Sequence, residues 1–125
     1  MITLNGETMT HHYLLAALWA TTDWTNGDRP LDDTHDTEDI ANPEVAGEDC
    51  EAFLADNKTD LQTCIDQYGA TWEQHGRDFL LTRDGHGTGF WDRGYGAIGK
   101  RLTDACRPYG DSGLYVGDDG KVWIA

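Results

Sequence analysis

The chain has 125 residues and a formal net charge of −14. This length is typical of one domain with a single hydrophobic core, so we expect residues 1–125 to fold as a single domain. A field of this sign repels nucleic-acid phosphates and anionic membrane surfaces, so direct binding to either is not expected. No apolar run approaches the roughly 20 residues that span a bilayer, and the apolar segment 12–20 has no basic flank or cleavage site of a signal peptide. We therefore expect a soluble, intracellular protein.

The negative charge is concentrated in the first half of the chain. Residues 1–60 contain 14 Asp and Glu against 2 Lys and Arg, whereas residues 61–125 contain 9 against 7. The acidic surface is therefore expected to belong to an N-terminal, helical half that covers residues 1–69.

A first helix and an acidic loop are predicted at the start of this half. Thr10 is suited to cap a helix that continues to about residue 22, because apolar residues recur there at helical spacing. Residues 31–40 are rich in acidic residues and lack apolar periodicity. They indicate a solvated loop whose ends are fixed by Leu31 and Ile40.

A second helical region is predicted after Asn42 and Pro43, which suit an N-cap and the first position of a helix. Its apolar pattern continues to Gly69, a residue type that commonly ends helices. The pattern is compatible with one long helix over 43–68 or with two short ones.

The second half, residues 70–125, is predicted to form a hairpin, a helix and a second hairpin. The segments 78–83 and 88–92 have strand composition and flank a connection rich in turn residues, and 114–116 and 121–124 do the same around 117–120. Between them, apolar residues at helical spacing predict a third helix over 98–109. The expected fold is α+β, with a four-stranded antiparallel sheet covered on one face by helices.

The predicted core takes apolar residues from every one of these elements. Its members are Leu15, Trp19, Phe53, Leu54, Leu61, Ile65, Phe79, Leu81, Phe90, Leu102, Tyr115 and Val122.

The segment TRDGHGTGFWDRG, residues 82–94, is the one stretch with several residues of catalytic types. A catalytic histidine needs an oriented partner, and neither a nucleophile nor a second histidine lies near His86 in the sequence. The glycines suit a tight connection, so a structural turn is the favoured interpretation. Residues 94–99 also fit G-x-G-x-x-G, but too little chain follows for the parallel βαβ unit of a dinucleotide site. We predict no catalytic residue and no cofactor.

No metal site is predicted either. The acidic run 32–39 lacks the residue order of a calcium-binding loop, and the adjacent His11 and His12 diverge on a helix. The cysteines, Cys50, Cys64 and Cys106, are odd in number and have no C-x-x-C spacing, which indicates buried free thiols.

Three blocks in the second half, RDFLLTRDGHGTGFWDR (77–93), GKRLTDA (99–105) and LYVGDDGK (114–121), resemble a family of small acidic proteins from tailed bacteriophages. YLLAALW (13–19) and PLDD (30–33) are similar to the same family. The resemblance covers most of the chain and implies a phage or prophage origin and residence in the bacterial cytoplasm. It implies no activity, because the family consists chiefly of proteins of unassigned function.

Three function classes follow from these observations. The first is an inhibitor that presents carboxylates to the cationic cleft of a host DNA-processing or defence protein. The second is a binding or scaffold module with an exposed aromatic surface that includes Trp24, Trp72, Trp91 and Trp123. The third is an enzyme centred on Asp84, His86, Asp92 and Arg93. The first is favoured, and its predicted partner-binding residues are Asp32, Asp33, Asp36, Glu38, Asp39, Glu44, Glu48 and Glu51.

Overall fold

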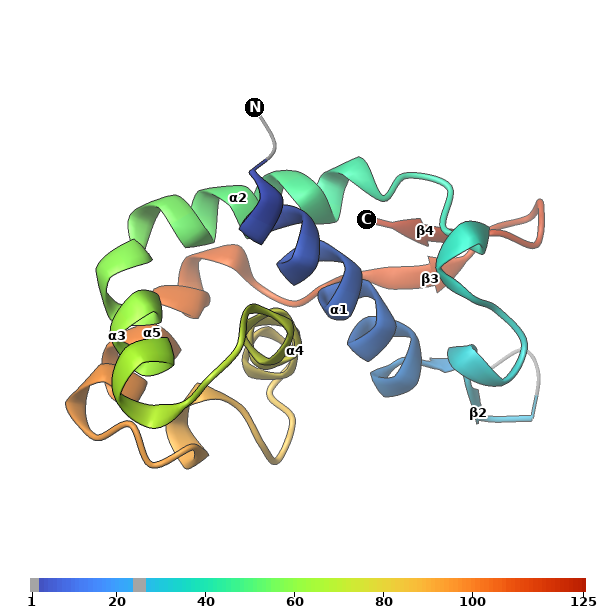
Figure 1. Cartoon of the computed structure of the whole chain (residues 1–125). Helices are drawn as coiled ribbons and strands as arrows, with labels where there is room; N and C mark the ends of the chain where they lie inside the picture. The colour runs from blue at the N-terminus through green and yellow to red at the C-terminus, as the bar shows by residue number, and fades with distance from the viewer. Residues whose placement is uncertain (1–2, 24–26) are drawn as a thin grey trace.

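The computed structural model describes residues 3–23 and 27–125 (Figure 1). Within these residues helices predominate over strands, and the predicted α+β class is confirmed. The α-helices are α1 (Leu4–Ala20), α2 (Glu44–Asp56), α3 (Lys58–Tyr68), α4 (Trp72–Arg83) and α5 (Ala97–Cys106). The strands are β1 (Thr22–Asp23), β2 (Arg29–Pro30), β3 (Leu114–Val116) and β4 (Val122–Ile124), and short 3-10 helices are η1 (Leu31–Asp33), η2 (Thr37–Asp39), η3 (Phe90–Asp92) and η4 (Arg107–Tyr109).

The first helix begins well before the predicted position. The Thr3 hydroxyl caps α1 by accepting a hydrogen bond from the Gly6 N–H at 2.9 Å. Thr10 lies inside the helix, where its hydroxyl donates to the Gly6 carbonyl at 2.7 Å. The prediction of Thr10 as the cap is therefore wrong, because a threonine inside a helix can also satisfy its hydroxyl on the carbonyl of the preceding turn.

The predicted hairpin of 78–83 with 88–92 is wrong, because residues 72–83 form the helix α4. The Thr71 hydroxyl caps this helix by accepting a hydrogen bond from the Gln74 N–H at 3.1 Å. The buried face of α4 includes His75, Gly76 and Asp78, and these residues hide its apolar periodicity in the sequence. An irregular connection that contains η3 follows over residues 84–96.

The described strands form two separate antiparallel pairs, so the predicted four-stranded sheet is wrong. β1 pairs with β2, and β3 pairs with β4 in the register that places Tyr115 opposite Trp123. The second predicted hairpin is therefore confirmed, and Gly120 supplies a positive φ of 81° in its turn. Ile40 adds a single parallel bridge to Val122 of β4.

The second helical region consists of two helices, which meet at Asn57. The Asn57 side chain donates to the Phe53 carbonyl at 2.9 Å and so bonds the last turn of α2. Gly69 ends α3 in the left-handed conformation, as predicted. Asn42 does not cap α2, because Pro43 occupies the N-cap position and the Asn42 side chain bonds to Ile124 instead. The predicted third helix is present as α5 and η4.

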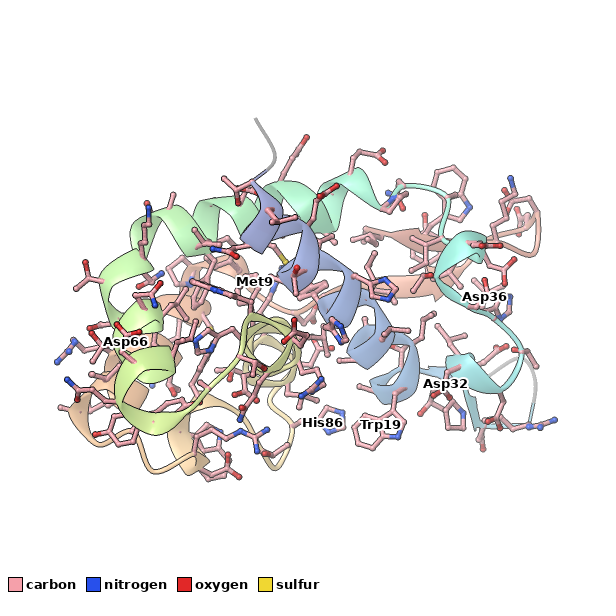
Figure 2. The ribbon with its side chains drawn as sticks, viewed as in Figure 1. Met9, Trp19, Asp32, Asp36, Asp66 and His86 are labelled. Atoms are coloured by element: carbon pink, nitrogen blue, oxygen red, sulfur yellow. The ribbon has the colours of Figure 1, made fainter. Side chains whose placement is uncertain are left out.

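The two predicted halves share one buried cluster. Phe53 of α2 stacks on Phe79 of α4 with ring centroids 4.2 Å apart, and on Phe90 of η3 at 5.7 Å. α1 packs mainly against α4, and its Met9 lies near the centre of the molecule (Figure 2). Leu31 and Ile40 are buried, which confirms that they fix the ends of the acidic run.

The predicted core is right for most of its members. The prediction is wrong for three members, whose side chains are exposed: Leu15 at 41%, Trp19 at 54% and Tyr115 at 51%. The buried positions of α1 include Met9, Tyr13, Ala16 and Ala17, and the two small alanines allow close packing in the contact of α1 with α4. Ile65 is partly buried against the cluster. The confirmed members are Phe53, Leu54, Leu61, Phe79, Leu81, Phe90, Leu102 and Val122.

Candidate functional site

The eight predicted partner-binding carboxylates follow one another along η1, η2 and the first three turns of α2. We call this surface the acidic band. Asp32 and Asp36 lie at the end of the molecule opposite Asp66 of α3 (Figure 2). The band comprises Asp32, Asp33, Asp36, Glu38, Asp39, Glu44, Glu48 and Glu51.

Half of the acidic band has structural partners. Asp33 pairs with Arg29 at 3.1 Å. Asp36 and Asp39 form a capping box around η2, in which each carboxylate accepts a backbone N–H at 3.0 Å. Glu51 accepts the Thr3 N–H at 2.8 Å and so ties the start of α1 to α2. These four carboxylates stabilise local turns and helix ends.

The other half consists of Asp32, Glu38, Glu44 and Glu48, which we call the open carboxylates. All four residues are exposed, and none of their carboxylates has a hydrogen-bond or ion-pair partner within the described residues. Before Lys58, Arg29 is the single Lys or Arg in the sequence, and it already pairs with Asp33. The open carboxylates are therefore free to meet positive charges of another molecule.

A groove of about 590 Å³ adjoins the band between α1 and the start of α2. Glu7 and Glu44 line it from opposite helices, and Leu14, Pro43 and Gly47 supply much of its apolar surface. Such a groove suits a long basic side chain, whose aliphatic stem and charged end need both kinds of surface. Sequence reasoning missed Glu7 because it started the first helix at Thr10, although Thr3 could have been recognised as a cap.

The TRDGHGTGFWDRG segment joins α4 to the C-terminal part of the chain. Arg83 donates to the carbonyls of Tyr109, Gly110 and Asp111 at 2.9–3.0 Å. The neighbouring Asp84 carboxylate accepts both the N–H and the hydroxyl of Ser112, at 2.7 and 2.8 Å. Consecutive residues of opposite charge thus fasten residues 109–112 to the end of α4.

The residues of the enzyme hypothesis each have a separate structural partner. The Asp92 carboxylate accepts the Gly89 N–H at 3.0 Å, and this bond holds the pKa of Asp92 below its usual range. Arg93 binds the buried Asp78 carboxylate through Nε and Nη2, with Nη2 at 2.7 Å from Oδ1. Asp84 bonds Ser112, as above. Local structure therefore explains these residues without a catalytic role.

His86 contacts Trp19, with ring centroids 5.7 Å apart, and the two side chains lie next to each other in Figure 2. Leu15, one helical turn before Trp19, is also exposed. We call Leu15, Trp19 and His86 the aromatic patch. Sequence reasoning missed the patch because it placed Leu15 and Trp19 in the core, and no signal in the sequence distinguishes an exposed tryptophan on a helix from a buried one.

The predicted aromatic surface is only partly exposed. Trp91 is 53% exposed, whereas Trp72 packs against the core and the Trp123 indole N–H donates to Asp119 at 3.1 Å. Trp24 lies outside the described residues. Within the described residues, the exposed tryptophans are Trp91, which the prediction included, and Trp19, which it did not.

The cysteines are buried and free, as predicted. Burial raises the pKa of the Cys50 and Cys106 thiols to about 12 and that of Cys64 to about 11, so the reactive thiolate forms are disfavoured. Across residues 3–23 and 27–125, no group of three or more His, Cys, Asp or Glu is arranged to hold a metal ion.

Two further findings concern the described helices and the comparison with known proteins. In the described part of the chain, no helix combines the length and the apolar character needed to cross a membrane. Among known proteins, no family model, curated sequence or solved structure matches this chain.

Proposed function

We propose that this protein is a non-enzymatic phage accessory protein that inhibits a host DNA-processing or defence protein. In this proposal, the acidic band occupies a cationic cleft that otherwise holds nucleic-acid phosphates. The resemblance of the sequence to small acidic phage proteins suggests that the encounter takes place in the bacterial cytoplasm. The partner is a protein, since a net charge of −14 opposes direct binding to nucleic acid.

The observation that carries the proposal is the set of four exposed carboxylates that have no partner in the described residues. Structural carboxylates would be expected to cap turns or pair with Arg or Lys, as the other half of the band does. The open carboxylates instead stand on short helices fixed by Leu31 and Ile40 and on the first turns of α2. A surface that is ordered before binding loses less entropy when it meets a partner.

Electrostatics supports fast and selective association with a cationic cleft. Like charges spaced along one surface raise the rate of encounter with an oppositely charged partner and reject acidic competitors. The groove beside Glu7 and Glu44 adds a place where one basic side chain of the partner can be partly enclosed. The band therefore offers both long-range attraction and a short-range contact.

Charge reversal at exposed positions inside and outside the acidic band tests the proposal. The band variant carries Glu38→Lys, Glu44→Lys and Glu48→Lys, and a control variant carries Asp66→Lys, Asp104→Lys and Asp111→Lys at exposed sites elsewhere. Each protein is used to capture partners from a host lysate, with the folded fraction matched by thermal melting. We expect a DNA-binding protein on the wild type and on the control but not on the band variant. Equal capture by both variants would contradict the proposal.

The aromatic patch supports a second candidate function, a protein-binding module with apolar contacts. Tryptophan side chains contribute strongly to binding when they become buried at an interface. Trp19 is 54% exposed and so is accessible to a partner. The two functions are separated by Trp19→Ala. Loss of capture by Trp19→Ala with retention by the band variant would favour the aromatic patch over the acidic band.

A further inference from the structure

The outer edge of β4 is covered by the segment that precedes α2. The Ala41 N–H donates to the Val122 carbonyl at 2.8 Å. The Asn42 side-chain amide donates to the Ile124 carbonyl at 2.9 Å, and its oxygen accepts the Ile124 N–H at 2.8 Å. This carboxamide thus takes the place of a neighbouring strand.

The outer edge of β3 has no such cover. The Gly117 N–H donates to the Lys121 carbonyl and the Ala125 N–H to the Gly113 carbonyl, which makes these two pairs the hydrogen-bonded pairs of the ladder. Hydrogen-bonded pairs alternate along an antiparallel ladder, so the backbone groups of Leu114 and Val116 point away from β4. Within residues 3–23 and 27–125, no hydrogen bond reaches these four groups.

A groove of about 460 Å³ lies in front of this edge. Leu114, Tyr115 and Val116 form one wall, and residues 20–23 form the other, at the end of α1 and in β1. In Figure 1, β3 lies between β4 on one side and the end of α1 on the other. Leu31, which is 1% exposed, contributes apolar surface. The groove therefore combines unpaired backbone donors and acceptors with an apolar lining.

We propose that the edge of β3 binds an extended, basic peptide segment of another protein, which adds as a further strand. Backbone hydrogen bonds to Leu114 and Val116 would supply the affinity, and alternate side chains of the segment would enter the groove. The proposal goes beyond the function of the acidic band and does not depend on it.

Charge complementarity selects a basic segment. The β3–β4 turn carries Asp118 and Asp119 against Lys121. η1 and the preceding β2 together carry Asp32 and Asp33 against Arg29. Both of these segments, which continue the chain from the lining residues Val116 and Leu31, are therefore net negative. A lysine or arginine at alternate positions of the segment would face these carboxylates, while small apolar residues between them would face the lining.

The free protein offers a first test by amide hydrogen exchange. The Leu114 and Val116 N–H groups should exchange much faster than the Tyr115 N–H, which lies in a hydrogen-bonded pair. Similar protection of all three amides in the free protein would overturn the proposal, because the edge would then already be occupied.

The second test uses a defined probe, a short end-blocked peptide in which lysine and valine alternate. We expect this peptide to protect the Leu114 and Val116 amides from exchange. A version that is N-methylated at every residue, and a version with glutamate in place of lysine, should bind much more weakly. Absence of protection, or equal binding of either version, would overturn the proposal.

Val116→Pro tests the edge without removing the hairpin, because the Val116 N–H is not part of the ladder with β4. Binding of the lysine–valine peptide should weaken by about fivefold or more, since a donor is lost and the ring obstructs an added strand. Val116→Thr, which keeps the N–H and the branched shape, is the matched control and should bind as the wild type does. Unchanged binding by a folded Val116→Pro protein would overturn the proposal.

Discussion

Arg83 and Asp49 form an ion pair, with Nη1 2.8 Å from Oδ2, that connects α4 of the second half to α2 of the first. Nη1 also donates to the Tyr13 hydroxyl of α1 at 2.9 Å. The guanidinium lies 5.5 Å from the ring centroids of both Phe79 and Tyr109. The Arg83 side chain is only 6% exposed. Through these contacts, one residue of the TRDGHGTGFWDRG segment connects α1, α2 and the region around Tyr109.

Arg83→Gln should destabilise the protein by about 3–5 kcal/mol, because it leaves Asp49 and several backbone carbonyls without their donor. Arg101→Gln is the control. Arg101 also binds an aspartate, Asp60, but its side chain is 58% exposed, so its loss should change the free energy of unfolding only slightly. Urea unfolding of both variants gives the comparison, and equal losses would show that Arg83 does not have this central role.

The crossing of α1 and α4 depends on Gly76. A Cβ atom at this position would overlap the Met9 carbonyl oxygen, which belongs to backbone and cannot move aside. Gly76→Ala should therefore destabilise the protein by about 2 kcal/mol or more. Gly47→Ala in α2 is the matched control, since its nearest contact would be Thr10 Cγ2 at 4.0 Å, and it should stabilise by up to about 1 kcal/mol. A neutral Gly76→Ala in thermal melting would contradict this packing.

Two leucines that the sequence places in the core differ in the structure. Leu102 of α5 is fully buried, so Leu102→Ala should cost about 2–5 kcal/mol. Leu15 of α1 is 41% exposed, so Leu15→Ala should cost less than about 1 kcal/mol. Denaturant unfolding measures both, and similar losses at the two positions would mean that Leu15 is buried after all.

Turn residues and apolar spacing predicted much of the fold, including α5, the β3–β4 hairpin and the end of α3 at Gly69. They failed where burial contradicts residue type. Asp78 and His75 are fully buried on α4 although they are polar. The start of α4 therefore has no apolar helical pattern in the sequence, and the apolar run 79–81 that follows resembled a strand. On α1, alanines and Met9 are buried while Trp19 is exposed. Tertiary packing decided these positions, and a single sequence carries no record of it.

For the acidic band, too, the sequence predicted one part and tertiary structure decided the other. The high density of carboxylates was visible in the sequence, and the exposure of Asp32, Glu38, Glu44 and Glu48 agrees with it. Which carboxylates have structural partners was not visible, because the partners of Glu51 and Asp36 depend on helix ends that the prediction misplaced or did not include. The contribution of Glu7 from α1 likewise required the relative positions of two helices.

His75 gives the protein a pH-dependent stability. Its imidazole is fully buried beside the rings of Trp72 and Phe90, and burial lowers the pKa of His75. The unfolded chain takes up this proton near the ordinary pKa of about 6.5, whereas the folded protein does so at lower pH. The unfolded state therefore binds more protons as the pH falls below that value, and the free energy of unfolding should decrease by up to about 1.4 kcal/mol per pH unit.

The variant His75→Gln isolates this effect, because glutamine retains a donor for the Leu61 carbonyl, which the His75 Nε2–H reaches at 3.0 Å. Its free energy of unfolding, measured in urea between about pH 7.5 and 5.5, should vary less with pH than that of the wild type. Burial raises the pKa of Asp78, and the Arg93 guanidinium opposes that shift. The Asp78 carboxylate is present in both proteins, and its electrostatic interaction with His75 is part of the effect that the variant removes. Parallel curves would show that His75 is not the group responsible.

The most direct measurement of the proposed function is competition between double-stranded DNA and this protein for the captured host partner. If the acidic band occupies the cleft that holds phosphates, DNA should displace the protein, and binding should weaken steeply with salt because exposed charges are screened over about 8 Å at physiological ionic strength. The partner should bind the wild type and the DNA mutually exclusively. Formation of a ternary complex, with an affinity for this protein that does not change with salt, would contradict the account.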